Sequence, residues 1–91
     1  MPRWWQKDSH MALSATHRFL VEANRLAGPD FYFRGQAVAA ALGYSEEETE
    51  MAMRSLDHRK LLIRLTDGQA RLRASGRTLA RMLEARAAAD A

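Results

Sequence analysis

The sequence contains no cysteine, and this absence excludes disulfide bonds and metal sites built on thiolates. It leaves open whether the chain works in a reducing or an oxidising compartment. No stretch approaches the roughly 18 consecutive apolar residues that a membrane-spanning helix needs. The N-terminal stretch also lacks the apolar central region of a signal peptide, so we expect a cytoplasmic protein.

Motifs that carry chemistry are missing as well. There is no glycine-rich phosphate loop, no nucleophile elbow and no pair of carboxylates placed for acid–base catalysis. The histidines His10, His17 and His58 lie far apart, and none has a carboxylate at ligand spacing. The sequence therefore predicts no enzyme, no metal site and no cofactor.

The chain is long enough for one small domain with a single modest core. It has 91 residues, of which 1–12 form an N-terminal extension without periodicity and 13–91 form the domain. The extension ends in a His-Met pair of the kind that a common cloning site encodes, so whether all of it is native stays open. We expect its two tryptophans, Trp4 and Trp5, to pack onto the domain or onto a second subunit.

Positive charge is concentrated in one part of the chain. Residues 54–86 carry nine basic and three acidic side chains, a net charge of +6, whereas residues 1–53 are slightly acidic. A basic region of this kind is typical of a surface that binds a polyanion, most often nucleic acid. The alternative is a solvated arginine-rich face, because 12 arginines against 2 lysines, with 17 alanines, also follow from a GC-rich coding sequence.

Apolar spacing predicts the first half of the domain. A helix is expected over 14–27, with Ser14 as its cap, and a short strand over 31–33. The aromatic residues of that strand fit a core better than a platform for base stacking. A second helix is expected over 35–42, ended by Gly43.

Two more helices are expected after this point. Ser45 and Glu48 form a capping box that opens a helix reaching about Arg59. Its buried face should carry Thr49, Ala52, Met53 and Leu56. A last helix should begin at the cap Ser75, and its buried stripe is expected to be Leu79, Met82 and Leu83.

Between these helices, the sequence "LIRLTDGQARLRAS" predicts a β-hairpin. Asp67-Gly68 is a strong signal for a two-residue type I′ turn. Counting outward from this turn places Arg64 opposite Arg71 and puts Ile63, Leu65, Ala70 and Leu72 on the core face. Like charges directly opposite each other destabilise a strand pair, and a bound anion would relieve the repulsion.

The predicted order is helix, short strand, helix, tight turn, helix, two-stranded hairpin, helix. In this order the sequence resembles winged helix-turn-helix transcriptional regulators of the MarR-like or PadR-like kind. The matching segments are "VAAALGYS" (38–45), "LLIRL" (61–65) and "SGRTLARML" (75–83). The resemblance implies a mainly α fold with a small β-hairpin, in the α+β class: a three-helix core, a two-stranded wing and a C-terminal helix.

The resemblance also implies a function and a site. In such regulators the third helix enters the major groove of double-stranded DNA and the wing reaches phosphates or the minor groove. The resemblance implies that the chain is a transcriptional regulator and that it binds DNA as a homodimer. The residues that it implies for reading base edges lie on the third helix: Met51, Arg54, Ser55 and His58. The residues that it implies for the wing contacts are the arginines Arg64, Arg71 and Arg73.

The acidic start of the third helix leaves a second function open. Four acids in five residues, Glu46, Glu47, Glu48 and Glu50, would repel phosphate. Acids in a first turn also favour the helix dipole, and one of them completes the capping box. The alternative function is a winged-helix protein–protein interaction module within a larger assembly, whose acidic third helix binds a basic partner.

Overall fold

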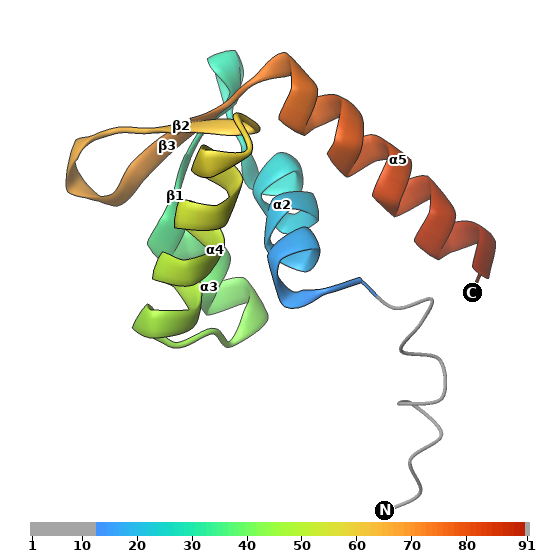
Figure 1. Cartoon of the computed structure of the whole chain (residues 1–91), viewed down its shortest axis with the longest axis horizontal. Helices are drawn as coiled ribbons and strands as arrows, with labels where there is room; N and C mark the ends of the chain where they lie inside the picture. The colour runs from blue at the N-terminus through green and yellow to red at the C-terminus, as the bar shows by residue number, and fades with distance from the viewer. Residues whose placement is uncertain (1–12, 91) are drawn as a thin grey trace, which may run out of the picture.

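The fold is mainly helical with a small antiparallel sheet, in the α+β class (Figure 1). A computed structural model describes residues 13–90. In this part of the chain it has four α-helices, labelled α2 to α5, and one three-stranded sheet. The strands lie in the order β1 (Tyr32–Arg34), β3 (Gln69–Leu72) and β2 (Leu62–Arg64). The expectation for Trp4 and Trp5 lies outside the described residues.

The first described helix, α2 (Ala15–Leu26), begins and ends close to the predicted positions. Ser14 is its cap, because the Ser14 hydroxyl accepts a hydrogen bond of 3.1 Å from the backbone N–H of His17. The helix is amphipathic, and its apolar face is fully buried at Phe19, Leu20 and Ala23. The prediction for this helix is confirmed.

The aromatic segment that follows forms a 3₁₀ turn (Pro29–Phe31) and then the strand β1 (Tyr32–Arg34). Phe33 lies in the core and meets Phe19 edge to face, as expected for a core residue. Tyr32 points the other way and is 46% exposed. The sequence predicted this strand without a partner, whereas β1 pairs with β3 and completes the sheet.

Two helices joined by a tight turn come next. The helix α3 (Gly35–Leu42) ends at Gly43, which adopts the left-handed conformation with φ 73°. The helix α4 (Glu46–His58) opens with the predicted capping box between Ser45 and Glu48. Both helices were predicted with nearly these bounds.

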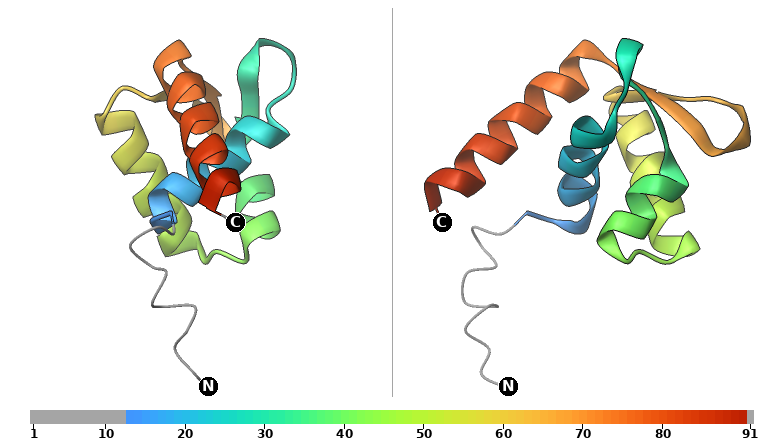
Figure 2. Two further views of the ribbon diagram at one scale, coloured as in Figure 1. Left: turned by 90° about the vertical axis from the view of Figure 1, so that its right-hand side faces the viewer. Right: turned by 180° about the vertical axis from the view of Figure 1, so that it is seen from behind.

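One apolar core joins all of these elements. The two helices α2 and α4 pack against each other and against α3, and α5 crosses over α2 (Figures 1 and 2). The core comprises Phe19, Leu20, Ala23, Phe33, Val38, Ala52, Met53, Leu56, Leu61, Leu62, Ala70, Leu72, Ala80 and Leu83.

The hairpin forms, but its register differs from the prediction. The predicted turn is present: Asp67 and Gly68 have φ 59° and 74°, and the Gln69 N–H donates to the Thr66 carbonyl. The N–H that donates to the Gln69 carbonyl belongs to Leu65, at 2.8 Å, so that Leu65 and Thr66 both oppose Gln69. This is a β-bulge, and one extra residue in a strand shifts its pairing by one.

The shift reverses the faces of the strand β2 (Leu62–Arg64) relative to β3 (Gln69–Leu72). Arg64 pairs with Ala70, and Ile63 pairs with Arg71. The predicted pairing of Arg64 with Arg71 is therefore wrong. Side chains alternate along a strand, so Leu62 and Arg64 face the helices, while Ile63 and Arg71 lie on the outer face of the sheet.

The last helix, α5 (Ala74–Asp90), differs from the prediction at both its cap and its buried face. Ser75 lies inside the first turn, where its hydroxyl donates to the Lys60 carbonyl at 2.9 Å and therefore caps nothing. Ala80 and Leu83 are buried, but Met82 is 62% exposed. The buried face runs through Gly76, Ala80 and Leu83, and Met82 lies to the side of it. The pattern alone did not show this, because the small residues Gly76 and Ala80 gave no strong apolar signal.

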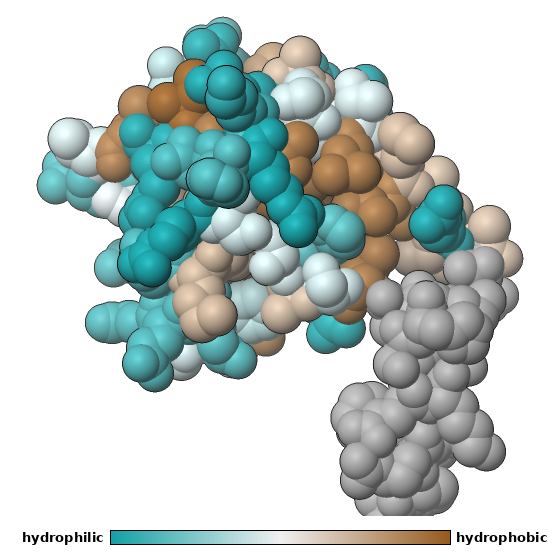
Figure 3. All heavy atoms as spheres, viewed as in Figure 1, coloured by the Kyte–Doolittle hydropathy of each residue, from teal (hydrophilic) through white to brown (hydrophobic). Residues whose placement is uncertain are grey.

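The far part of α5 leaves the rest of the domain, and residues 84–89 are exposed (Figure 2). Hydrophobic side chains reach the surface where α2 and α5 lie side by side (Figure 3). Within the described residues, no helix combines the length and the apolar character needed to cross a membrane.

Candidate functional site

The side chains expected to read base edges gather on the exposed face of α4. Helical spacing of three and four residues places them side by side, and they line a shallow hollow of about 340 Å³ formed by Met51, Arg54, Ser55 and His58. Met51 is the most exposed large apolar residue in the described part of the chain, at 68%. The helix therefore presents these four side chains together, with its core residues on the opposite side.

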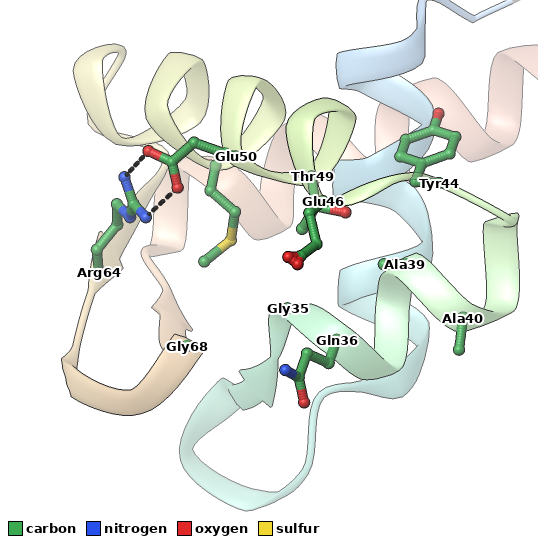
Figure 4. Close-up of a pocket in the computed structure, with 11 residues that line it drawn as sticks. Gly35, Gln36, Ala39, Ala40, Tyr44, Glu46, Thr49, Glu50, Arg64 and Gly68 are labelled. Carbon is green, nitrogen blue, oxygen red and sulfur yellow. Dashed lines mark hydrogen bonds and ion pairs between the residues drawn. The ribbon is translucent and has the colours of Figure 1, made fainter.

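Next to this face, Glu50 binds two arginines. Its Oε1 accepts a hydrogen bond of 2.7 Å from Arg64 Nη2, and its Oε2 accepts one of 3.0 Å from Arg64 Nη1 (Figure 4). Arg54 Nη2 also donates to Oε2, at 3.1 Å. The pair with Arg64 is bidentate and joins α4 to β2.

These contacts keep the glutamate ionised. The hydrogen bond from Arg64, followed by that from Arg54, holds the pKa of Glu50 below its ordinary value. The hydrogen bond to the Glu50 carboxylate raises the pKa of Arg64 in turn. At neutral pH the Glu50 carboxylate compensates the charge of Arg64. Arg64 therefore differs from the unpaired wing arginine that the sequence suggested.

A groove of about 600 Å³ lies beside this ion pair, between α3, the start of α4 and the tip of the hairpin (Figure 4). Small residues of α3 form much of its wall, and the Glu46 carboxylate points into the space between the two helices. It is lined by Gly35, Gln36, Ala39, Ala40, Tyr44, Glu46, Thr49, Glu50, Met53, Arg64 and Gly68.

The remaining predicted contacts lie elsewhere. Arg71 and Arg73 line a second hollow on the outer face of the sheet, together with Arg77 of α5. The structure therefore brings Arg54 and Arg64 together at Glu50, and Arg71 and Arg73 together on the other side of the sheet. The predicted set of arginines is divided between two faces.

Sequence reasoning missed two participants. Glu50 was considered only as one of several acids, and Arg77 was not considered as a site residue at all. The guanidinium of Arg77 lies 3.6 Å from the centre of the Phe31 ring. No local pattern signals such a contact, because the two residues are far apart in sequence and belong to different elements.

No group of three or more histidine, aspartate or glutamate side chains in residues 13–90 is placed to hold a metal ion. Comparison of the chain with models of protein families, with curated proteins and with solved structures gave no match.

Proposed function

We propose that the chain is a small cytoplasmic DNA-binding protein of the winged helix-turn-helix type that regulates transcription. The observation that carries the proposal is the succession α3, tight turn, α4 and hairpin, in which α4 keeps one face exposed beside the hairpin. An exposed helix beside a β-hairpin fits the major groove of duplex DNA, with the hairpin next to the backbone.

In this proposal Arg54 is the principal reader. It extends from the exposed face of α4, and its planar guanidinium matches the O6 and N7 acceptors of guanine. Its ion pair with Glu50 is solvent-exposed, and such pairs are weak enough to exchange for a base. Ser55 and His58 lie on the same face and reach neighbouring base pairs.

Arg64 has a different role from the one that the sequence suggested. Because it is bound to Glu50 and is separated from Arg71 by the sheet, the two arginines do not share one phosphate. Its side chain is 35% exposed and holds the hairpin against α4. We infer that this ion pair fixes the angle between the two DNA-contacting elements.

The test is a selection of preferred sequences from a random duplex pool, followed by titrations at several salt concentrations. Arg54→Ala should change the preferred sequence, since a lost guanine contact costs about 1–3 kcal/mol of discrimination. Arg25→Ala is the matched control, because Arg25 also forms an exposed helical ion pair, with Glu22 on α2. An unchanged sequence preference in Arg54→Ala would contradict the proposal. An equal change of sequence preference in the Arg25→Ala control would contradict it as well.

A homodimer is part of this proposal. One such domain contacts few base pairs, and regulators of this type gain specificity by binding two half-sites. The exposed Met82 and the apolar surface between α2 and α5 are the surface on which we place the second copy (Figure 3). This surface lies away from the exposed face of α4, so the chain can dimerise and bind DNA at the same time.

One observation favours a second function, a protein–protein interaction module. Glu50 binds both Arg54 and Arg64, and Glu46 and Glu47 have no ion-pair partner among the described residues. The acidic start of the helix then suits a basic protein better than phosphate. Absence of duplex binding at low salt, together with a co-purifying basic protein, would replace the first proposal by this one.

A further inference from the structure

The outer face of the sheet carries a second concave site, on the side away from α4. β2, β3, the first turn of α5 and the 3₁₀ turn before β1 meet around a hollow of about 330 Å³. Its walls are apolar at Phe31, Ile63, Leu72 and Ala74 and basic at Arg71, Arg73 and Arg77. Within residues 13–90, no helix covers this face of the sheet (Figures 1 and 2).

Two of the three arginines are held in place by neighbouring aromatic and backbone groups. Arg77 lies against the Phe31 ring, 3.6 Å from its centre. Arg71 donates from Nε to the carbonyl oxygen of Asp30 at 3.1 Å and lies 5.6 Å from the centre of the Tyr32 ring. These contacts use the flat faces and the Nε of the guanidinium groups, so the terminal N–H groups remain free to bind a ligand.

Such positioning favours binding. A flexible arginine loses side-chain entropy when it binds an anion, whereas a stacked guanidinium has lost part of that entropy on folding. The hollow therefore presents donors in fixed places, which a cluster of solvated arginines does not.

The charge at this site has no internal compensation among residues 13–90. The ion pairs of this part of the chain involve Arg25, Arg54 and Arg64. The first turn of α5 adds the positive end of a helix dipole at Ala74. Three neighbouring positive charges repel one another, and an anion in the hollow removes that repulsion.

We propose that Arg71, Arg73 and Arg77 form a binding site for a phosphate group. Arginine forks bind phosphate oxygens in pairs, and three forks around one hollow supply donors from several directions to a tetrahedral anion. The phosphate belongs to a nucleic-acid backbone or to a free phosphorylated small molecule, which offer the same chemistry. The site is independent of the proposed role of α4, because it lies on the opposite face of the sheet.

The test follows the arginine Nε–H signals by NMR while inorganic phosphate, and in a separate arm a random 20-base-pair duplex, is added to the full chain. The signals of Arg71, Arg73 and Arg77 should move together and with one affinity. The double variant Arg73→Gln/Arg77→Gln should bind about tenfold more weakly. In the duplex arm it should also flatten the dependence of log affinity on log salt by about 1–2.

The matched control is Arg81→Gln/Arg86→Gln, which removes the same amount of charge from exposed positions of α5 that do not line the hollow. It should leave phosphate affinity within about twofold and should change the salt slope less. Arg77→Lys retains the charge but loses the fork and the stacking, and it should weaken phosphate binding nearly as much as Arg77→Gln.

The two arms of the experiment distinguish nucleic acid from a free phosphorylated molecule as the ligand. Saturation by the duplex at lower concentration than by inorganic phosphate assigns the site to nucleic acid, and saturation by phosphate without duplex binding assigns it to a free phosphorylated molecule. Equal losses in the two double variants would overturn the proposal, because they would show a general charge effect. Unchanged Nε–H signals of the three arginines in both arms would overturn it as well.

Discussion

Arg64 illustrates how one long-range contact decides where a single side chain points. The bulge at Leu65 and Thr66 turns Arg64 toward α4, where its guanidinium reaches the Glu50 carboxylate. Glu50 makes that direction favourable by accepting two hydrogen bonds from it. The same shift gives Leu62 a fully buried place opposite Leu72.

This contact predicts a titration behaviour. Replacing Arg64 with glutamine should move the pKa of Glu50 up toward its ordinary value, since the hydrogen bond from Arg64 is the largest cause of its depression. Arg54→Gln should raise it less. Carboxyl chemical shifts followed by NMR against pH would measure both changes, and a larger rise in Arg54→Gln would contradict the assignment.

The same depression fixes how the ion pair contributes to stability as the pH changes. A carboxyl whose pKa is lower in the folded state stabilises the fold above its unfolded pKa and loses that contribution as the pH falls through the folded pKa. Urea unfolding at pH 7 should therefore give a lower free energy of unfolding for Arg64→Gln than for the native chain. At a pH below the folded pKa of Glu50 the difference should shrink, and a difference that grows toward acid would contradict this prediction.

Of the glycines, Gly76 is the one at which an added side chain would meet the closest neighbour. A side-chain carbon at this position would overlap the backbone carbonyl oxygen of Leu61, which is part of the main chain and has no room to move. Gly76→Ala should lower the free energy of unfolding by about 3 kcal/mol. Gly28→Ala is the control for thermal and urea unfolding, because nothing lies within 4 Å of a side-chain carbon there.

A comparable loss of stability in Gly28→Ala would indicate that the effect comes from glycine replacement in general. The sequence marked Gly76 only through the family resemblance of "SGRTLARML". The physical reason, a close approach of α5 to Leu61 in the segment between α4 and β2, becomes visible only in three dimensions.

Elements with strong local signals were predictable, and this explains why α2, α3 and α4 have nearly the expected bounds. Ser14, Gly43 and the pair Ser45/Glu48 act within one helical turn, so residues close together in the sequence are enough to predict their effect. The face that α4 buries follows from its periodicity in the same way.

The hairpin shows where such prediction ends. Its turn residues were assigned correctly, but the alternating segment "LIRL" can turn either Ile63 and Leu65 or Leu62 and Arg64 toward the helices. Apolarity favours the first choice, and the structure takes the second because Glu50, on another element, supplies a partner for Arg64. The candidate site was predicted in part for the same reason: one helix face was recoverable, and groupings across elements were not.

The turn between α3 and α4 predicts a separate stability effect. The Tyr44 hydroxyl donates to the Ala15 carbonyl at 2.8 Å, and its ring stacks on Phe19, so that it joins this turn to the start of α2. Burial raises the pKa of Tyr44. Tyr44→Phe should cost about 1 kcal/mol of unfolding free energy in urea titrations.

Tyr32→Phe is the matched control for this change, because the Tyr32 side chain is 46% exposed and its ring contact with Arg71 survives the loss of the hydroxyl. It should be neutral within about 0.5 kcal/mol. Equal effects of the two substitutions would show that the hydrogen bond to Ala15 does not stabilise the turn.

At the scale of the whole molecule, opposite charges occupy opposite ends. The start of α4 is acidic, whereas the outer face of the sheet and the first turn of α5 are basic. A duplex approaching from solution is attracted to the second region first, since the long-range field guides association. Binding by α4 then depends on contacts strong enough to outweigh its own acidic start.

The assembly prediction concerns the surface between α2 and α5. We expect a homodimer at tens of micromolar, and Met82→Glu should convert it to a monomer because it places a charge on the apolar contact. Met51→Glu is the control, since Met51 is equally exposed on α4 but lies outside this surface. Light scattering would give the masses, and a monomeric native chain, or a dimer that survives Met82→Glu, would contradict the prediction.

Two hydrogen bonds close the base of the hairpin: the Arg73 N–H donates to the Leu61 carbonyl at 3.0 Å, and the Ser75 hydroxyl donates to the adjacent carbonyl of Lys60. The hairpin between these points is therefore a loop whose two ends are held in place by the rest of the domain. Lengthening it costs little, about 0.6 kcal/mol for each doubling of loop length. A peptide tag or a foreign recognition loop inserted at Thr66-Asp67 would thus be displayed on a stable stem, which makes this small domain a scaffold for grafting.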